Sequence, residues 1–171
     1  MNYKDSSSNQ VKITKRSIDS VSDITTFSSE ELNRTVTEKC REVLNDLKND
    51  TVGTEETVSI KVSSLKSEKR KGGQGEGTVQ GIEFDEPYIS IHNHPSGETF
   101  SGRDIDKFAY STNHIAMCVV GNNGKVYILQ KNTDFDWVSF AINSFDIQSK
   151  ADYAENVLKG AEKYGFKYYK A

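Results

Sequence analysis

Hydrophobic and polar residues alternate in patterns that divide the chain into a series of predicted elements. Apolar residues recur at helical spacing between Ser28 and Asp50, which predicts a helix with one buried stripe. The strict alternation at 56–62 is typical of a half-buried strand. Other apolar runs predict strands at 78–84, 88–91, 115–120 and 125–131, and helices at 101–114 and 149–164. Strands interleaved with helices predict an α/β fold, with a mixed β-sheet flanked by helices.

The two ends of the chain differ from its middle. Residues 1–27 are rich in Ser, Asp and Lys with scattered apolar residues, which is typical of a flexible N-terminal tail. Residues 28–131 carry the regular patterns and are predicted to form the folded domain. Residues 132–171 are predicted to be a C-terminal helical extension packed on that domain. Within the domain, the charged and glycine-rich stretch 63–77 predicts a loop, because no phosphate-binding glycine pattern lies between a strand and a helix.

Composition narrows the class of protein. The 171 residues correspond to about one domain. With 22 Lys and Arg against 25 Asp and Glu, the formal charge of −3 argues against a nucleic-acid partner held by bulk charge. No apolar run reaches the roughly 20 residues of a membrane-spanning helix, and no secretory signal is visible, so no membrane partner is expected. The two cysteines, Cys40 and Cys118, lie far apart, which favours a reducing, cytoplasmic location.

Two of the three histidines form the most informative pattern in the sequence. His92 and His94 are two residues apart, so on a strand both imidazoles project from one face, and Pro95 ends that strand. Ser101 is expected to cap the next helix, which places Asp104 in its first turn, near the end of the strand. Two imidazoles and one carboxylate with an open fourth position are the ligand set of a catalytic zinc site.

Other interpretations of these residues exist. Helix capping alone explains the Ser101-x-x-Asp104 spacing, although it does not explain two histidines on one face of a strand. Two histidines and a carboxylate also form the facial triad of non-haem Fe(II) enzymes. The third histidine, His114, is expected at a helix end, where the helix dipole favours an imidazole.

The run His92-x-His94-Pro95 followed by Ser101-x-x-Asp104 resembles the JAMM signature of the JAB/MPN metalloprotease superfamily. The sequence of residues 91–97, IHNHPSG, is most similar to the bacterial RadC-like and phage-associated branches. The resemblance covers residues 32–131. Five residues separate Pro95 from Ser101, where six or seven are usual in the eukaryotic and RadC-like members, and the shorter loop resembles the phage-associated versions. The resemblance implies the sandwich of the JAB/MPN fold, which is similar to that of cytidine deaminases.

The resemblance also implies roles for single residues. His92, His94 and Asp104 would ligate one Zn²⁺ per chain with water as the fourth ligand, and Ser101 would hydrogen-bond that water or the oxyanion. A glutamate from an earlier strand would act as general base, and Glu55 and Glu56 both stand at the expected place. Glu56 is the predicted base, because it shares a strand face with the apolar residues of 56–62 and would point inward. A slip of one residue would reverse this assignment.

The predicted function is therefore that of a zinc-dependent metallohydrolase that cleaves an amide bond, either a peptide or an isopeptide bond, in a peptide or protein substrate. The alternative is a non-catalytic JAB-like metal-binding module that serves in phage or mobile-element assembly and contacts an assembly partner there.

Overall fold

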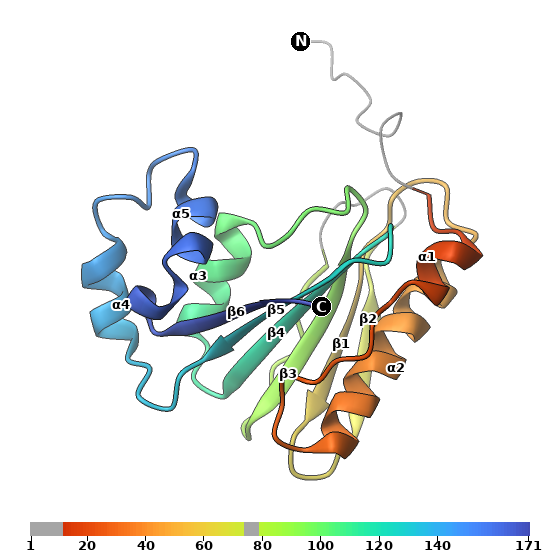
Figure 1. Ribbon diagram of the computed structural model, residues 1–171, viewed down its shortest axis with the longest axis horizontal. Helices are drawn as coiled ribbons and strands as arrows, with labels where there is room; N and C mark the ends of the chain where they lie inside the picture. Colours follow the sequence, from red (N-terminus) through yellow and green to blue (C-terminus); the bar gives the residue numbers. More distant parts are fainter. Residues whose placement is uncertain (1–11, 74–78) are drawn as a thin grey trace.

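The protein has an α/β fold built on a six-stranded mixed sheet (Figure 1). The computed structural model describes residues 12–73 and 79–171. The strand order is β2-β1-β3-β4-β5-β6, and every neighbouring pair is antiparallel except β3 and β4, which are parallel. The strands are β1 (Glu56–Lys61), β2 (Ser67–Lys71), β3 (Tyr88–His94), β4 (His114–Gly121), β5 (Val126–Lys131) and β6 (Phe166–Lys170). The predicted α/β class, with a mixed sheet and flanking helices, is confirmed.

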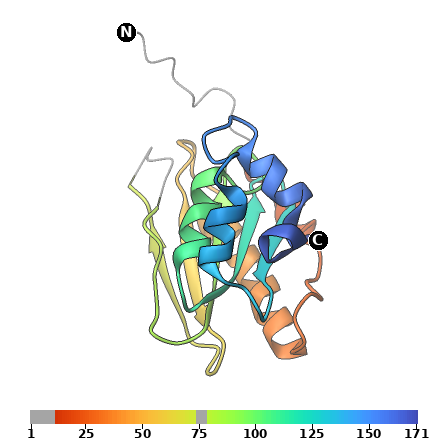
Figure 2. The ribbon, with the colours of Figure 1, turned by 90° about the vertical axis from the view of Figure 1, so that its left-hand side faces the viewer.

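Helices cover both faces of the sheet, so the molecule has three layers (Figures 1 and 2). One face carries α1 (Lys15–Asp19) and α2 (Glu30–Leu47). The opposite face carries α3 (Gly102–Tyr110), α4 (Trp137–Ser144), α5 (Tyr153–Lys159) and the 3₁₀ helix η2 (Ala161–Tyr164). Within 12–73 and 79–171, no helix combines the length and the apolar character that crossing a bilayer requires.

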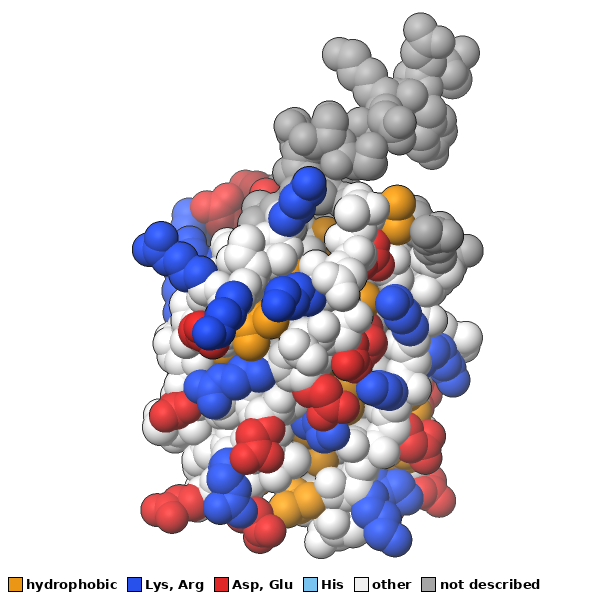
Figure 3. All heavy atoms as spheres, turned by 90° about the vertical axis from the view of Figure 1, so that its right-hand side faces the viewer, with side chains coloured by type: hydrophobic (Ala, Val, Ile, Leu, Met, Phe, Trp, Pro, Cys, Tyr) orange, Lys and Arg blue, Asp and Glu red, His pale blue; other side chains and the backbone are white. Residues whose placement is uncertain are grey.

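The α2 face of the sheet holds the first of two hydrophobic cores. Ser29 caps α2 by accepting a hydrogen bond from the backbone N–H of Leu32, one residue after the predicted start. The buried stripe of α2 packs against inward side chains of the central strands, and its main members are Val36, Cys40, Leu44, Val58, Ile60, Ile91 and Cys118. Charged side chains of both signs are interspersed over the outer face seen in Figure 3. Lys69 of β2 pairs with Glu42 and Asp46 of α2.

The second core lies between the sheet and helices α3, α4 and α5. Aromatic rings dominate it, with Phe108, Phe140 and Phe166 all nearly or fully buried. Helix α3 is the crossover that connects the parallel pair β3 and β4, as parallel strands require. The end of β3 and the start of α3 are therefore adjacent in sequence and in space.

The predicted N-terminal tail is wrong for residues 12–27. Thr14 caps α1 in a capping box, and the side chains of Ile13, Val21, Ile24 and Phe27 are buried in the core of the α2 face. Arg41 of α2 fastens this segment by donating a hydrogen bond to the carbonyl oxygen of Val21. Residues 1–11 lie outside the described part of the chain.

Four further predictions need correction. The stretch 63–77, predicted to be a loop, contains the edge strand β2, and residues 74–78 lie outside the described chain. The predicted strand at 78–84 is not formed in residues 79–84. Residues 132–171 are not a purely helical extension, because β6 pairs with β5 and belongs to the same sheet as the rest of the fold. The single helix predicted at 149–164 is divided into α5 and η2.

Candidate metal centre

The end of β3 brings the two predicted histidine ligands together. His92 and His94 project from the face of the sheet that carries α3, and their Nε2 atoms lie 3.0 Å apart. Both side chains are largely buried, with 12% and 13% of their surface exposed. The chain then turns sharply at Gly97, whose φ of +75° favours glycine and where a Cβ would come within 2.6 Å of Asn123.

Asp104 completes the cluster from the first turn of α3. Its Oδ1 lies 3.5 Å from Nε2 of His92, and its Oδ2 lies 3.4 Å from Nε2 of His94. Ser101 caps the helix in a capping box, so the predicted start of α3 is confirmed. The Ser101 backbone N–H and hydroxyl group both donate to Oδ2 of Asp104, at 2.8 Å and 2.7 Å. The cap therefore fixes the carboxylate with its oxygens facing the imidazoles.

The three side chains have the geometry of a candidate metal-binding triad. One ligand atom from each of His92, His94 and Asp104 lies within 4.8 Å of the others. Nδ1 of His94 lies 3.0 Å from the carbonyl oxygens of Glu98 and Thr99. Because a carbonyl only accepts, this nitrogen carries the hydrogen, and the lone pair of Nε2 is left for a cation. The donor set of two imidazole nitrogens and one carboxylate thus fits zinc.

The electrostatics of the cluster favour a positive charge at its centre. Burial acts to raise the pKa of Asp104, but the two imidazoles outweigh it and hold that pKa well below its usual range. Burial acts to lower the pKa of His94, but the Asp104 carboxylate outweighs it and raises that pKa above the ordinary value. A cation is the species that satisfies one carboxylate and two imidazoles at this spacing.

The structure corrects the prediction that Glu56 lies beside the histidines. In the β1–β3 ladder, Thr57 pairs with His92, so these two residues share a face. Glu56 shares the opposite face with Val58 and Ile60, under α2, as its alternation predicted. That face is inward, but it does not hold the cluster of His92, His94 and Asp104. Glu55 lies immediately before β1, and the same register continued by two residues would set it opposite His94.

Glu55 and Glu56 consequently have different surroundings. Burial raises the pKa of Glu55 to about 7, and the charges of His94 and Asp104 both act on its carboxyl group. Burial also raises the pKa of Glu56 to about 7, but there the neighbour is the Asp46 carboxyl group of α2. Oε1 of Glu56 is buried without a hydrogen-bond partner among the described residues. Glu55 is therefore the glutamate that lies near the three candidate ligands.

His114 does not join the cluster. It is buried, with its ring stacked on Tyr88 and its Nε2 atom 2.7 Å from the Ser90 hydroxyl oxygen. Burial, together with the charges of Lys131 and His92, lowers its pKa to about 3, so the ring is neutral. His114 is a packed core residue at the start of β4.

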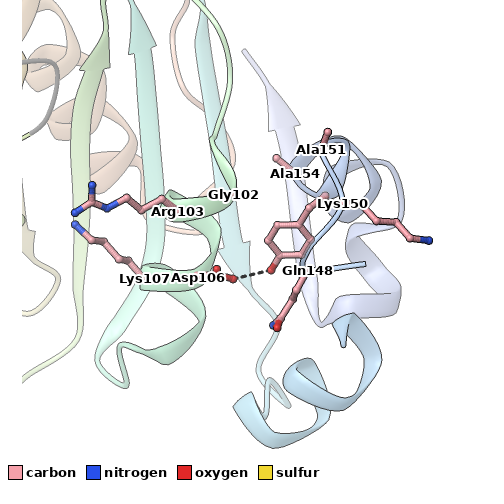
Figure 4. A pocket seen from close by; sticks show the side chains of 9 residues that line it. Gly102, Arg103, Asp106, Lys107, Gln148, Lys150, Ala151 and Ala154 are labelled. Carbon is pink, nitrogen blue, oxygen red and sulfur yellow. Dashed lines mark hydrogen bonds between the residues drawn. The ribbon is translucent and has the colours of Figure 1, made fainter. Parts of the chain in front are cut away.

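A separate open pocket lies on another side of α3 (Figure 4). It lies between the first turns of α3 and residues 148–154, and no member of the histidine cluster lines it. Asp106 faces this pocket, where its Oδ1 accepts a hydrogen bond of 2.7 Å from the Tyr153 hydroxyl group. Asp104 and Asp106 are thus close in sequence but have different partners.

Comparison of the chain with protein-family models, curated protein sequences and solved structures finds no match. The resemblance to the JAB/MPN superfamily rests on the motif residues alone and stays a prediction.

Proposed function

We propose that this protein is a zinc-dependent hydrolase of amide bonds. The observation that carries the proposal is the convergence of His92, His94 and Asp104, whose ligand atoms lie within 4.8 Å of one another. These three residues would hold the ion. A zinc ion bound there would polarise an amide carbonyl group and lower the pKa of a water molecule toward neutrality.

Glu55 is proposed as the general base, in place of Glu56. It lies on the face of the sheet that carries the ligands, and the charges of His94 and Asp104 act on it. A carboxyl group with a pKa of about 7 can accept a proton from the attacking water and return it to the leaving amine near neutral pH. The raised pKa of Glu55 therefore suits both halves of the proton transfer.

Ser101 is proposed to act mainly through Asp104. Its hydroxyl hydrogen is donated to Oδ2 of Asp104, and its oxygen accepts from the Asp104 backbone N–H. Both interactions hold the carboxylate toward the imidazoles. The role that the family resemblance implies, a hydrogen bond to the oxyanion, would require the Ser101 hydroxyl group to leave Asp104.

The proposal is tested by metal binding and amide hydrolysis in paired variants. Metal-free protein is titrated with Zn²⁺ and then assayed on a quenched-fluorescence peptide library and on a peptide with an isopeptide-linked lysine branch. We expect Glu55→Gln to bind one zinc and to lose about 10²- to 10⁴-fold in turnover, the usual contribution of a general base. Glu56→Gln is the matched control and should keep both zinc binding and turnover.

Each outcome has a defined meaning. Equal turnover in wild type and Glu55→Gln would reject Glu55 as the base. Loss of turnover in Glu56→Gln alone would restore the assignment made from the sequence. Zinc binding by wild type without hydrolysis of either substrate class would reject the hydrolase and favour the non-catalytic metal-binding module.

A further inference from the structure

Asn93, the residue between the two histidines, projects from β3 in the opposite direction from its neighbours. Its side chain is fully buried, at 0% exposure, at the end of the sheet face that carries α2. The predicted metal-binding motif gives this residue no role. A fully buried amide needs hydrogen-bond partners, because an unsatisfied one costs stability.

The partners of the Asn93 amide lie on both sides of Glu55 in the sequence. Oδ1 of Asn93 accepts a 2.7 Å hydrogen bond from the backbone N–H of Glu56. Nδ2 donates to the carbonyl oxygen of Thr54 at 3.2 Å. Nδ2 also donates to Oδ1 of Asn122, in the turn between β4 and β5, at 3.1 Å. One side chain thus holds the backbone immediately before and immediately after Glu55.

Asn93 is also connected directly to the two histidines. It is the peptide neighbour of both ligands, and its partner Asn122 donates its backbone N–H to the carbonyl oxygen of His94 at 3.1 Å. A single side chain, that of Asn93, therefore connects the backbone of the two histidines to the backbone on either side of Glu55. A backbone N–H only donates and a carbonyl only accepts, so a carboxamide satisfies both partners where a carboxylate or an apolar group cannot.

We propose that Asn93 is a positioning residue that sets the place of the Glu55 carboxylate relative to the two imidazoles, an inference that rests on the proposed function. A general base works only within hydrogen-bond reach of the proton it takes. A displacement of about 1 Å can cost about 10²-fold in rate. Asn93 holds Glu55 at its distance from the ligands without touching the substrate or the ion.

The test uses Co²⁺ as a paramagnetic probe in the full chain. Metal-free protein with ¹³C-labelled glutamate is loaded with Co²⁺, and Glu55→Gln identifies the Glu55 carboxyl signal. We expect Asn93→Ala to bind one Co²⁺ like wild type. The paramagnetic shift of the Glu55 carboxyl signal, however, should differ from that in wild type. Ser90→Ala is the matched control, because it also removes a buried polar group from β3, and it should leave the signal in place. Zinc-loaded Asn93→Ala should lose about 10²-fold in turnover, with no further loss in the Glu55→Gln background.

The outcomes separate this inference from the proposed function. Co²⁺ binding with an unmoved Glu55 signal in Asn93→Ala would overturn the positioning role and leave the metal site intact. Failure of wild type to bind Co²⁺ would overturn the proposed function, and this inference with it. Asn93→Ser is the second variant if alanine prevents folding, and failure of both to fold would assign Asn93 to stability alone and overturn the inference.

Discussion

Glu56 begins β1 and Glu55 immediately precedes it, and the surroundings of these two adjacent glutamates differ completely. Glu55 faces the candidate metal cluster, where an imidazole and a carboxylate act on it. Glu56 faces α2, where the Asp46 carboxyl group acts on it and where it lies among the apolar residues of the first core. Burial raises the pKa of both carboxyl groups to about 7.

The comparison shows that a raised pKa does not by itself mark a catalytic residue. Both glutamates carry the same shift for the same first reason, which is removal from water. The two glutamates differ in the face of the sheet toward which each side chain points, and therefore in the charged groups that lie near it. The following variants test this contrast between the histidine face and the α2 face of the sheet.

The largest effect is expected from Asp104→Ala on the histidine face. Loss of the only carboxylate in the triad should reduce bound zinc from one per chain toward none, because two imidazoles alone hold the ion poorly. Elemental analysis after dialysis measures the zinc content. Asp106→Asn, on the same helix but paired with Tyr153, should retain the metal. Zinc content in Asp104→Ala equal to wild type would disprove the ligand assignment.

A smaller effect on the same face is expected from Ser101→Ala. The Ser101 hydroxyl group donates a hydrogen bond to the Asp104 carboxylate. Loss of such a hydrogen bond to a metal ligand typically lowers metal affinity about 10- to 100-fold. Removal of the cap should also destabilise the fold by about 1 kcal/mol. Calorimetric titration with zinc gives the affinity, and Ser101→Thr should retain most of it. An unchanged zinc affinity in Ser101→Ala would limit Ser101 to helix capping.

The smallest effect is expected on the α2 face, from Glu56→Gln. Below pH 4.5 this carboxyl group is protonated in both states, but between pH 4.5 and about 7 the folded protein keeps a proton that the unfolded chain has released. The free energy of unfolding of wild type therefore falls as pH rises through this range. Because glutamine cannot ionise, the variant should be more stable by roughly 1–2 kcal/mol at about pH 8, with the gain fading toward pH 4.

Urea denaturation at both pH values measures this difference. Glu38→Gln, on the exposed side of α2, serves as the control and should show no such gain. A stability gain in Glu56→Gln that is the same at both pH values would mean that ionisation of Glu56 is not its source.

Sequence patterns predicted the central elements of the fold well, because each has one dominant periodicity. Helix α2 and strands β3, β4 and β5 lie close to where the apolar spacing placed them. Strand β2 was missed because all its residues are exposed, so no alternation marks it. The segment 12–27 was misread because its buried residues anchor an irregular chain against α2, and such contacts have no period.

The sequence predicted that His92, His94 and Asp104 come together, but not which glutamate lies near them. His92, His94 and Asp104 lie in one short segment, where strand alternation and helix capping fix their relative places. The base depends on which face of β1 meets them. Five consecutive residues of β1 are buried, since helices cover both sides of the sheet, so pointing inward does not distinguish Glu55 from Glu56. Only the pairing of Thr57 with His92 resolves the choice.

The crossover from β3 into α3 has a thermodynamic consequence for metal loading. All three candidate ligands lie between His92 and Asp104, so a bound ion would close only a short loop of chain. Closing a short loop removes little entropy from the unfolded ensemble, and the same few residues can still chelate when the rest of the molecule is denatured. Residual affinity of the unfolded chain reduces the stabilisation that saturating metal provides. Zinc would thus raise the melting temperature of this protein less than its affinity for the native state suggests.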